Sequence, residues 1–435
     1  MKLISKPSMN LNGKIRIPGD KSISHRALIC ASISEGISKI TNLQESEDVM
    51  NTLNSLRQLG INIYKESDCY FVEGKGFKGL QKSDGQLYFG NSGTGLRLMS
   101  GLLSSQDFSS SLSGDESLSK RPMKRIIDPL IEMGANISGS KMDTLPIHII
   151  PTKKIMGINY EMPIASAQVK SAILFASLGA DGKTKITEKS VSRDHTERMF
   201  EYFGANISYS KTETSLEKTM NFNSQNIQIP GDFSSSAFYI VASLISKNSE
   251  ITLKDVGLNP SRIALLNKLV EMGANIKVLN NSFFGKEPVA DIKVKSSALI
   301  ACEVASEDVP NLIDELPILF IASAFAEGIS SFDKIEELKH KESDRLKAMQ
   351  EGLDKMNIKN FFNGNKFCIE GRGQDFKTPH FLAETYYDHR IAMSFAIAGL
   401  NSSSSIEVSS SESINTSFPE FIDLGKKLGC NFERG

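Results

Sequence analysis

The chain has 435 residues, of which 40% are apolar and 23% are charged, and its formal net charge is −1. This composition is typical of a globular protein with a full core, and the near-zero charge excludes the basic surplus with which proteins hold nucleic acid. No apolar run approaches the roughly 20 residues that cross a bilayer, and residues 1–20 contain no uninterrupted apolar segment. We therefore expect a soluble, cytoplasmic protein that binds neither nucleic acid nor membrane.

A short phrase recurs along the chain and marks the ends of predicted helices. Each full copy holds a bulky apolar residue, glycine, a second apolar residue, asparagine and a further apolar residue, after an amphipathic run such as Met123–Met133. Glycine at this place is typical of a helix C-cap that leads into a strand. The copies lie roughly 70 to 85 residues apart, which indicates an internal repeat. They are residues 59–63, 133–137, 203–207, 272–276, a degenerate copy near 356–358, and 428–432.

A second phrase alternates with the first. It consists of a helix of small apolar residues, a Gly/Ser turn and a β-branched strand, as in residues 171–186. Each pair of phrases describes one α/β module, so the sequence predicts six modules. Helices that are apolar on most faces, such as Ser171–Leu178, are expected to be buried, with the sheets around them.

A third repeat divides the chain into halves. Residues 17–20 read Ile-Pro-Gly-Asp, and residues 229–232 read the same. We predict two pseudo-symmetric domains of three modules each, with the Pro-Gly turns as hinges between them. The domains would be residues 19–228, and residues 1–18 together with 229–435.

Polar and basic residues gather at the predicted helix starts in one module after another. Free N–H groups at a helix start attract anions, and Lys and Arg add full charges. Any one cluster alone is better explained as a solvated helix end. If parallel helices direct these ends at one cleft, however, the clusters together suit a ligand with several phosphate or carboxylate groups. In chain order the clusters are residues 18–26, 90–97, 119–125, 166–171, 192–197, 341–345 and 387–390.

Some clusters carry more specific expectations. Arg26 follows Ser22 by four residues and should share its helix face. Pro122 is expected at the first position of a helix. Lys341 and Arg345 are expected one helical turn apart.

Two carboxylates are the best candidates for acid–base chemistry. Asp314 lies at the entry to an apolar helix, where it could also serve as an N-cap. Glu342 is bracketed by Lys341 and Arg345, which would hold it ionised unless a bound anion offsets them.

The sequence gives no indication of a metal or an organic cofactor. The five cysteines form no Cys-x-x-Cys pair, and the six histidines form no pair at ligand spacing. The glycine-rich loop at residues 90–97 is not a Walker sequence, because no Gly-Lys-Ser/Thr follows it. We therefore expect no cofactor.

The clusters together resemble the 5-enolpyruvylshikimate-3-phosphate (EPSP) synthase family. The resemblance extends from about Ile4 to Phe421, and two segments, ASAQVKSA and SRDHTE, look like the bacterial class II branch. It implies an inside-out α/β barrel of two domains, each with three βαβαββ units, which agrees with the six modules. The motifs that carry it are PGDKSISHR, GNSGTGLR, KRPMKR, ASAQVKSA, SRDHTE, IDELP, KESDRL and YDHRIAM.

The resemblance also implies the substrates and their ligands. Shikimate 3-phosphate would bind first, after which the domains would close on phosphoenolpyruvate. For shikimate 3-phosphate the implied residues are Lys21, Ser22, Arg26, Ser166, Ala167, Gln168, Arg193, Asp314 and Lys341. For phosphoenolpyruvate they are Lys21, Gly93, Arg121, Gln168, Arg345 and Arg390.

The implied reaction is an addition followed by an elimination. The 5-hydroxyl of shikimate 3-phosphate attacks C2 of phosphoenolpyruvate while C3 is protonated, and phosphate leaves as a C3 proton is removed. We expect Glu342 to handle the proton at C3 and Asp314 the proton of the 5-hydroxyl, with Lys21 able to share either duty. Lys and Arg side chains that are already in position would stabilise the charge of the transition state. We expect the protein to be a monomer.

Two features concern the phosphoenolpyruvate site. Many relatives carry a Lys before the Phe-Pro near the C-terminus, whereas this chain has Ser417, so that contact is not carried over. The resemblance also implies sensitivity to glyphosate, an inhibitor that occupies this site. Gly93 should line the space for the inhibitor.

Two other functions were weighed. A UDP-N-acetylglucosamine enolpyruvyl transferase shares the fold and the phosphoenolpyruvate chemistry, but its loop usually carries a reactive Cys where residues 113–120 have none. A ring-shaped DNA clamp is also built from six α/β units, but it needs a basic lumen, which a net charge of −1 does not favour.

Overall fold

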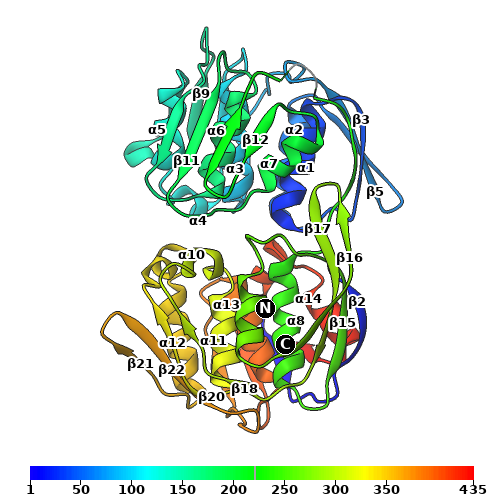
Figure 1. The fold of residues 1–435 in the computed structure, drawn as a ribbon, viewed down its shortest axis with the longest axis vertical. Helices are drawn as coiled ribbons and strands as arrows, with labels where there is room; N and C mark the ends of the chain where they lie inside the picture. The colour runs from blue at the N-terminus through cyan, green and yellow to red at the C-terminus, as the bar shows by residue number, and fades with distance from the viewer. Residues whose placement is uncertain (220–221) are drawn as a thin grey trace. The chain divides into compact units, whose positions relative to one another are not determined.

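The structure is a computed structural model that describes residues 1–219 and 222–435. The chain divides into two compact units, each with its own hydrophobic core (Figure 1). Among the described residues, no helix is long and apolar enough to cross a membrane. Unit 1 is residues 1–18, 230–282 and 288–435, and unit 2 is residues 19–229 and 283–287.

Unit 2 holds three four-stranded sheets that share one plan. In each sheet the first two strands are parallel and the other two continue it antiparallel. In sheet order, the strands are β14 (Asn226–Gln228), β3 (Glu35–Thr41), β5 (Cys69–Lys75), β4 (Asn62–Glu66); β6 (Leu87–Tyr88), β7 (Ser110–Ser113), β9 (Ile147–Ile150), β8 (Asn136–Ser138); and β10 (Asn159–Met162), β11 (Thr184–Glu188), β13 (Glu213–Leu216), β12 (Ile207–Tyr209).

Unit 1 repeats this plan three times. One parallel pair lies at an edge of each sheet, and β19 (Glu303–Val304) adds a second parallel partner for one strand. In sheet order, the strands are β2 (Asn12–Arg16), β15 (Glu250–Gly257), β17 (Glu287–Lys295), β16 (Asn275–Phe284); β18 (Leu299–Ile300), β20 (Ala326–Asp333), β22 (Lys366–Arg372), β21 (Asn360–Asn363); and β23 (Phe381–Ala383), β24 (Ile406–Val408), β1 (Leu3–Lys6), β25 (Asn431–Arg434).

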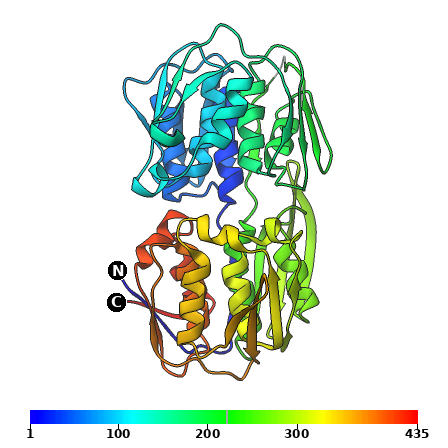
Figure 2. The same ribbon diagram turned by 90° about the vertical axis from the view of Figure 1, so that its left-hand side faces the viewer.

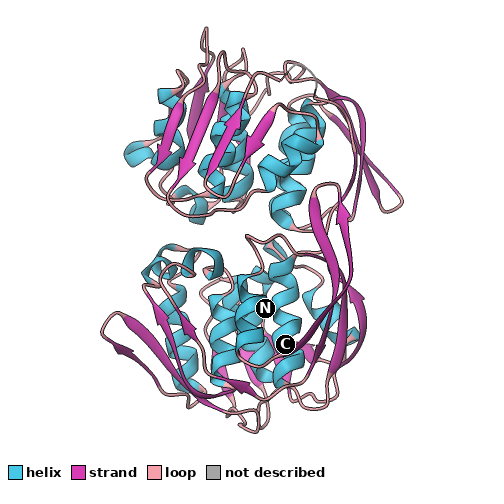
Figure 3. Cartoon of the chain, in the orientation of Figure 1, coloured by secondary structure: helices cyan, strands magenta, loops and turns pink. Residues whose placement is uncertain are grey.

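Each unit has three central helices that are buried around almost their whole circumference. They lie side by side within their unit (Figure 2), and the strands lie outside them (Figure 3). This arrangement confirms the predicted inside-out α/β fold, and it follows from helices that carry apolar residues on most faces. The central helices are α1 (Lys21–Ile33), α3 (Gly93–Ser104) and α6 (Ala167–Ser177) in unit 2, and α8 (Phe233–Ile245), α11 (Leu316–Ala324) and α13 (His389–Gly399) in unit 1.

Six further helices are amphipathic and end at the recurring phrase. They are α2 (Glu47–Gln58), α5 (Lys124–Glu132), α7 (His195–Tyr202), α9 (Ala264–Glu271), α12 (Arg345–Lys355) and α14 (Phe421–Lys427). The residue after each C-cap has a positive φ, from 60° at Asn357 to 96° at Gly429. The predicted left-handed helix ends are therefore confirmed, including the degenerate copy, where asparagine replaces glycine.

Two local expectations were wrong. Pro122 does not open a helix, because α5 begins at Lys124 after a non-helical Met123. Lys341 and Arg345 are not one helical turn apart, because α12 begins at Arg345 and Asp344 caps it by accepting a hydrogen bond from the Lys347 N–H at 3.0 Å. Lys341 instead follows a short 3₁₀ helix, Glu336–His340.

The contact between α3 and α6 requires a glycine. A Cβ added at Gly101 would lie 2.0 Å from the carbonyl oxygen of Ala172, which is a backbone atom and cannot move cheaply. Close packing leaves no room for one methyl group here. The two helices carry residues of the predicted site at their N-terminal ends, so this contact also sets the spacing between those ends.

We predict that Gly101→Ala lowers the free energy of unfolding by about 1–3 kcal/mol, because the methyl group overpacks this contact. Urea unfolding followed by circular dichroism measures the change. Gly85→Ala is the matched control, since a Cβ there meets nothing within 4 Å. Equal stability of Gly101→Ala and wild type would contradict the packing described.

Candidate active site

The predicted site residues lie at or beside the starts of helices in both units. Free N–H groups at these starts carry a partial positive charge, to which Lys and Arg add. In unit 2 the predicted residues are Lys21, Ser22, Arg26, Gly93, Arg121, Ser166, Ala167, Gln168 and Arg193. In unit 1 they are Asp314, Lys341, Glu342, Arg345 and Arg390.

The start of α1 orders two bases. Asp20 caps the helix by accepting the Ile23 N–H at 2.9 Å, and the Lys21 ammonium lies 2.9 Å from the carboxylate of Asp48. Arg26 is 2% exposed and donates from Nη1 to the Ser22 carbonyl at 2.9 Å. Ser22 and Arg26 therefore lie on one face of the helix, as predicted.

His25 is not available as an acid or base near neutral pH. Its ring is fully buried and lies between the hydroxyls of Thr52, at 2.8 Å, and Ser92, at 3.4 Å. Burial, together with the charges of Lys21 and Arg26, lowers the pKa of His25 to about 3. Its role is therefore to tie α1 to α2 and to the start of α3 as a neutral ring.

The glycine-rich loop leads into α3 among basic side chains. Gly93 is the first helical residue, and Ser92 caps the helix by accepting the Gly95 N–H at 3.1 Å. A Cβ at Gly93 would lie 2.9 Å from Arg97 Nη1 and 3.5 Å from Arg121 Nη1. The absence of a side chain at Gly93 thus leaves room for both guanidinium groups beside its buried backbone.

Gln168 and Arg121 are held by hydrogen bonds that end at α3 or its preceding loop. Arg97 donates to the amide oxygen of Gln168, and the Gln168 amide donates to Thr94 Oγ1 at 2.9 Å. Arg121 donates to Asn91 Oδ1 at 2.7 Å. These bonds bring the starts of α3 and α6 together with the segment that follows α4 (Glu116–Ser119).

The start of α6 is a polar turn. Ser166 is its N-cap, and the backbone N–H groups of the first turn belong to Ala167 and Gln168. All three residues are partly exposed. Arg193 precedes α7 by two residues. Burial lowers the pKa of Arg26, and the charge of Arg193 adds to this shift.

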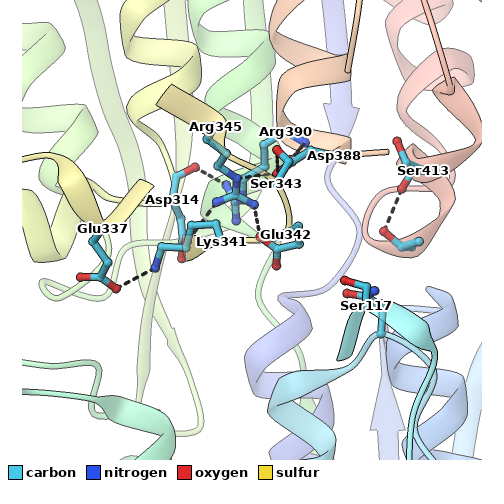
Figure 4. Close-up of polar contacts among 12 residues, drawn as sticks. Ser117, Asp314, Glu337, Lys341, Glu342, Ser343, Arg345, Asp388, Arg390 and Ser413 are labelled. Atoms are coloured by element: carbon cyan, nitrogen blue, oxygen red, sulfur yellow. Dashed lines mark hydrogen bonds and ion pairs between the residues drawn. The ribbon is translucent and has the colours of Figure 1, made fainter. Parts of the chain in front are cut away.

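In unit 1, Arg345 is the centre of the polar contacts (Figure 4). The side chain is 1% exposed and donates from Nε to the fully buried Asp388 at 2.8 Å. Its other nitrogens lie 2.5 Å from Glu342 and 3.8 Å from Asp314. Burial alone would lower the pKa of Arg345, but the three carboxylates outweigh it and raise the pKa. Arg345 is therefore a permanent cation that holds two candidate acid–base residues.

Lys341 and Arg390 complete the unit 1 group in Figure 4. Lys341 forms an ion pair with Glu337 at 3.0 Å. Arg390 donates to the Asp314 carbonyl at 2.7 Å and lies 3.6 Å from the buried carboxylate of Glu315. Asp314 is not a helix cap, because Glu315 occupies that position before α11. Its carboxylate is 21% exposed and can therefore meet a ligand.

Sequence reasoning missed several residues that organise these groups. Arg97, Asp48 and Asp388 each contact a predicted site residue, at Gln168, Lys21 and Arg345. Arg97 and Asp388 lie within the motifs GNSGTGLR and YDHRIAM, so their place in these motifs could have indicated a role at the site. Asp48 lies within no such motif. Among the described residues, no group of three His, Cys, Asp or Glu side chains could hold a metal ion.

Comparisons with known proteins agree over the whole chain. Residues 5–424 match the family model of EPSP synthase (3-phosphoshikimate 1-carboxyvinyltransferase). The 3-phosphoshikimate 1-carboxyvinyltransferase of Petrotoga mobilis is 46% identical over 98% of this chain and 99% of its own, and that of Vesicomyosocius okutanii is 43% identical over 99% and 98%.

Solved structures give the same result. The EPSP synthase of Acinetobacter baumannii superimposes with a TM-score of 0.91 at 41% sequence identity, covering 99% of each chain. Motifs, fold and full-length similarity therefore lead to one conclusion: the chain belongs to the EPSP synthase family.

Proposed function

We infer that the chain transfers the enolpyruvyl group of phosphoenolpyruvate to the 5-hydroxyl of shikimate 3-phosphate and releases phosphate. The observation that carries this inference is the match to the EPSP synthase family over residues 5–424. The geometry supports it, because both substrates are anions and the predicted site residues of each unit include cations at or beside helix starts. The activity belongs to the shikimate pathway of aromatic amino acid and chorismate biosynthesis.

Shikimate 3-phosphate is assigned to unit 2 for most of its contacts. The turn at Ser166–Gln168 offers backbone N–H groups and a hydroxyl for the 3-phosphate, and Arg193 adds a charge. Lys21, Ser22 and Arg26 on α1 would hold the ring and its substituents. Asp314 and Lys341 would meet the ring hydroxyls from unit 1.

Phosphoenolpyruvate is assigned to the guanidinium groups. Arg121, Arg345 and Arg390 are held by hydrogen bonds to other groups, so their forks are oriented before a substrate binds. Lys21, Gln168 and the backbone at Gly93 would complete this set. Ser417 stands where many relatives have Lys, so the three arginines carry more of the charge here.

The reaction consists of an addition and an elimination. Asp314 takes the proton of the 5-hydroxyl as its oxygen bonds to C2, and Glu342 gives a proton to C3, which forms a tetrahedral ketal phosphate. Glu342 then takes a proton back from C3 while the C2–O bond to phosphate breaks. Glu342 is 29% exposed and lies 2.5 Å from Arg345, so a substrate anion at Arg345 would favour its protonated form.

Four finer assignments complete the proposal. We assign the chain to the class II branch because ASAQVKSA at residues 165–172 and SRDHTE at residues 192–197 resemble that branch. The functional domains are residues 19–228, which hold shikimate 3-phosphate, and residues 1–18 with 229–435, which carry the acid–base residues. The protein acts as a monomer in the cytoplasm. It needs no metal or organic cofactor, because fixed bases stabilise the transition state.

The proposed function is tested by phosphate release from phosphoenolpyruvate with each candidate acceptor. We expect release with shikimate 3-phosphate and none with UDP-N-acetylglucosamine. Release with the nucleotide sugar alone would overturn the assignment. Chelator should leave the rate unchanged.

We predict that Glu342→Gln lowers kcat by about 10²–10⁴-fold, because the amide cannot exchange the C3 proton. Volume is preserved, so thermal unfolding should show an intact fold. Glu336→Gln is the matched control, being the same change at an exposed position of the adjacent 3₁₀ helix. Wild-type kcat in Glu342→Gln would remove this residue from the mechanism.

We predict that glyphosate inhibits the wild type and that Gly93→Ala weakens inhibition more than it weakens phosphoenolpyruvate binding. The new methyl group would press on Arg97 and Arg121, which costs about 1–3 kcal/mol in a rigid pocket, and the longer ligand should bear more of that cost. The measurement is the inhibition constant divided by the KM for phosphoenolpyruvate. The prediction fails if this ratio does not rise in the variant.

A further inference from the structure

A buried ionic cluster connects α6, β11 and α7 in unit 2, next to residues that are assigned to shikimate 3-phosphate. Lys170 on α6 places its ammonium 2.7 Å from the carboxylate of Glu188 and 2.7 Å from that of Glu197. Glu188 ends β11 and Glu197 lies in the first turn of α7. All three side chains are at most 3% exposed. We call them the Lys170 cluster.

Burying three charges is costly, and a purely structural contact would be served as well by apolar side chains. The cluster is also unbalanced, since it holds one ammonium and two carboxylates. Glu188 Oε1 and Glu197 Oε2 have no hydrogen-bond partner within the described part of the chain. A second carboxylate in the cluster favours the charged form of a cation nearby.

That cation is Arg26. Burial lowers its pKa to about 10, and the charge of Glu197 opposes this shift more strongly than any other group does. Arg26 remains charged at neutral pH. Glu197 thus supplies part of the charge that compensates a buried guanidinium.

Two hydroxyls connect the cluster's helices to Arg26. Arg26 donates from Nε to Thr196 Oγ1 at 2.7 Å and from Nη2 to Ser171 Oγ at 2.8 Å. The two hydroxyl oxygens lie 2.6 Å apart, and Ser171 donates to the Ala167 carbonyl at 2.6 Å. Thr196 then donates to Ser171, so each of the two hydroxyl hydrogens has one acceptor.

The sequence places these hydroxyls next to the cluster. Ser171 follows Lys170 on α6, and Thr196 precedes Glu197 on α7. The ion pairs therefore fix the starts of α6 and α7 to each other, and the adjacent hydroxyls fix the guanidinium between them. The α6 start is also the turn at residues 166–168, and Arg193 precedes α7.

We propose that the Lys170 cluster, acting through Thr196 and Ser171, is a positioning device that sets the orientation of Arg26 and the spacing of the α6 and α7 starts for shikimate 3-phosphate. Its members are positioning residues, because none of them touches the substrate in this assignment. The proposal rests on the proposed function and deepens it. It assigns part of the specificity for shikimate 3-phosphate to residues that do not contact this substrate themselves.

Thr196→Val tests the proposal, because it keeps the side-chain shape and removes the acceptor for Arg26 Nε. We expect the KM for shikimate 3-phosphate to rise about 10- to 100-fold, as for loss of a hydrogen bond to a charged group, with the KM for phosphoenolpyruvate little changed. Thr196→Ser restores the hydroxyl and should restore the KM. Thr184→Val is the matched control, because it makes the same change at a buried threonine on β11. Thr184 accepts a hydrogen bond from the Ser177 hydroxyl and not from Arg26.

Glu197→Gln provides a second test that does not depend on Thr196. It leaves Lys170 and Glu188 as a neutral pair, so the fold is retained, and the KM for shikimate 3-phosphate should rise alone. Calorimetric titration with shikimate 3-phosphate, without phosphoenolpyruvate, should show the same loss of affinity in both variants.

The proposal is overturned if folded Thr196→Val and Glu197→Gln bind shikimate 3-phosphate like the wild type. It is also overturned if Thr196→Val raises both KM values equally, or if Thr184→Val has the same effect. Failure of the proposed function looks different, because the wild type itself would then release no phosphate with shikimate 3-phosphate.

Discussion

The candidate site residues in each unit depend on one constraint: the charge of a buried cation must be balanced by groups next to it. Arg345 is 1% exposed and is surrounded by three carboxylates, and Arg26 is 2% exposed and is held by two hydroxyls and the field of Glu197. Compensation fixes each guanidinium before any ligand arrives, and fixed charges need no reorganisation during the reaction. The proposed binding of both anionic substrates depends on this arrangement.

The second contribution comes from the six modules. Five of the six central helices begin at a capping side chain, α11 being the exception. The packing of neighbours such as α3 and α6 sets the distance between their N-terminal ends. Helix dipoles add to the side-chain charges only where ends are close. The repeat therefore gives several modules the same kind of helix start, and the proposed function uses these helix starts to bind anions.

Local patterns predicted the fold better than they predicted contacts. The phrase that contains Gly60 and its copies identified six helix ends, because a left-handed residue is a local requirement. The start of α12 was misplaced, since the spacing of Lys341 and Arg345 fits a helix that the chain does not form there. The bond between Arg345 and Asp388 joins residues 43 positions apart, and no local pattern records such a contact.

The central claim is that the polar turn at the α6 start and Arg193 before α7 bind the phosphate of shikimate 3-phosphate. Arg193→Ala tests it most directly, in the full-length chain, through the KM values for both substrates. The account predicts a selective loss of affinity for shikimate 3-phosphate, of the roughly 1.5–3 kcal/mol that a charged contact contributes. An equal rise in both KM values would contradict it.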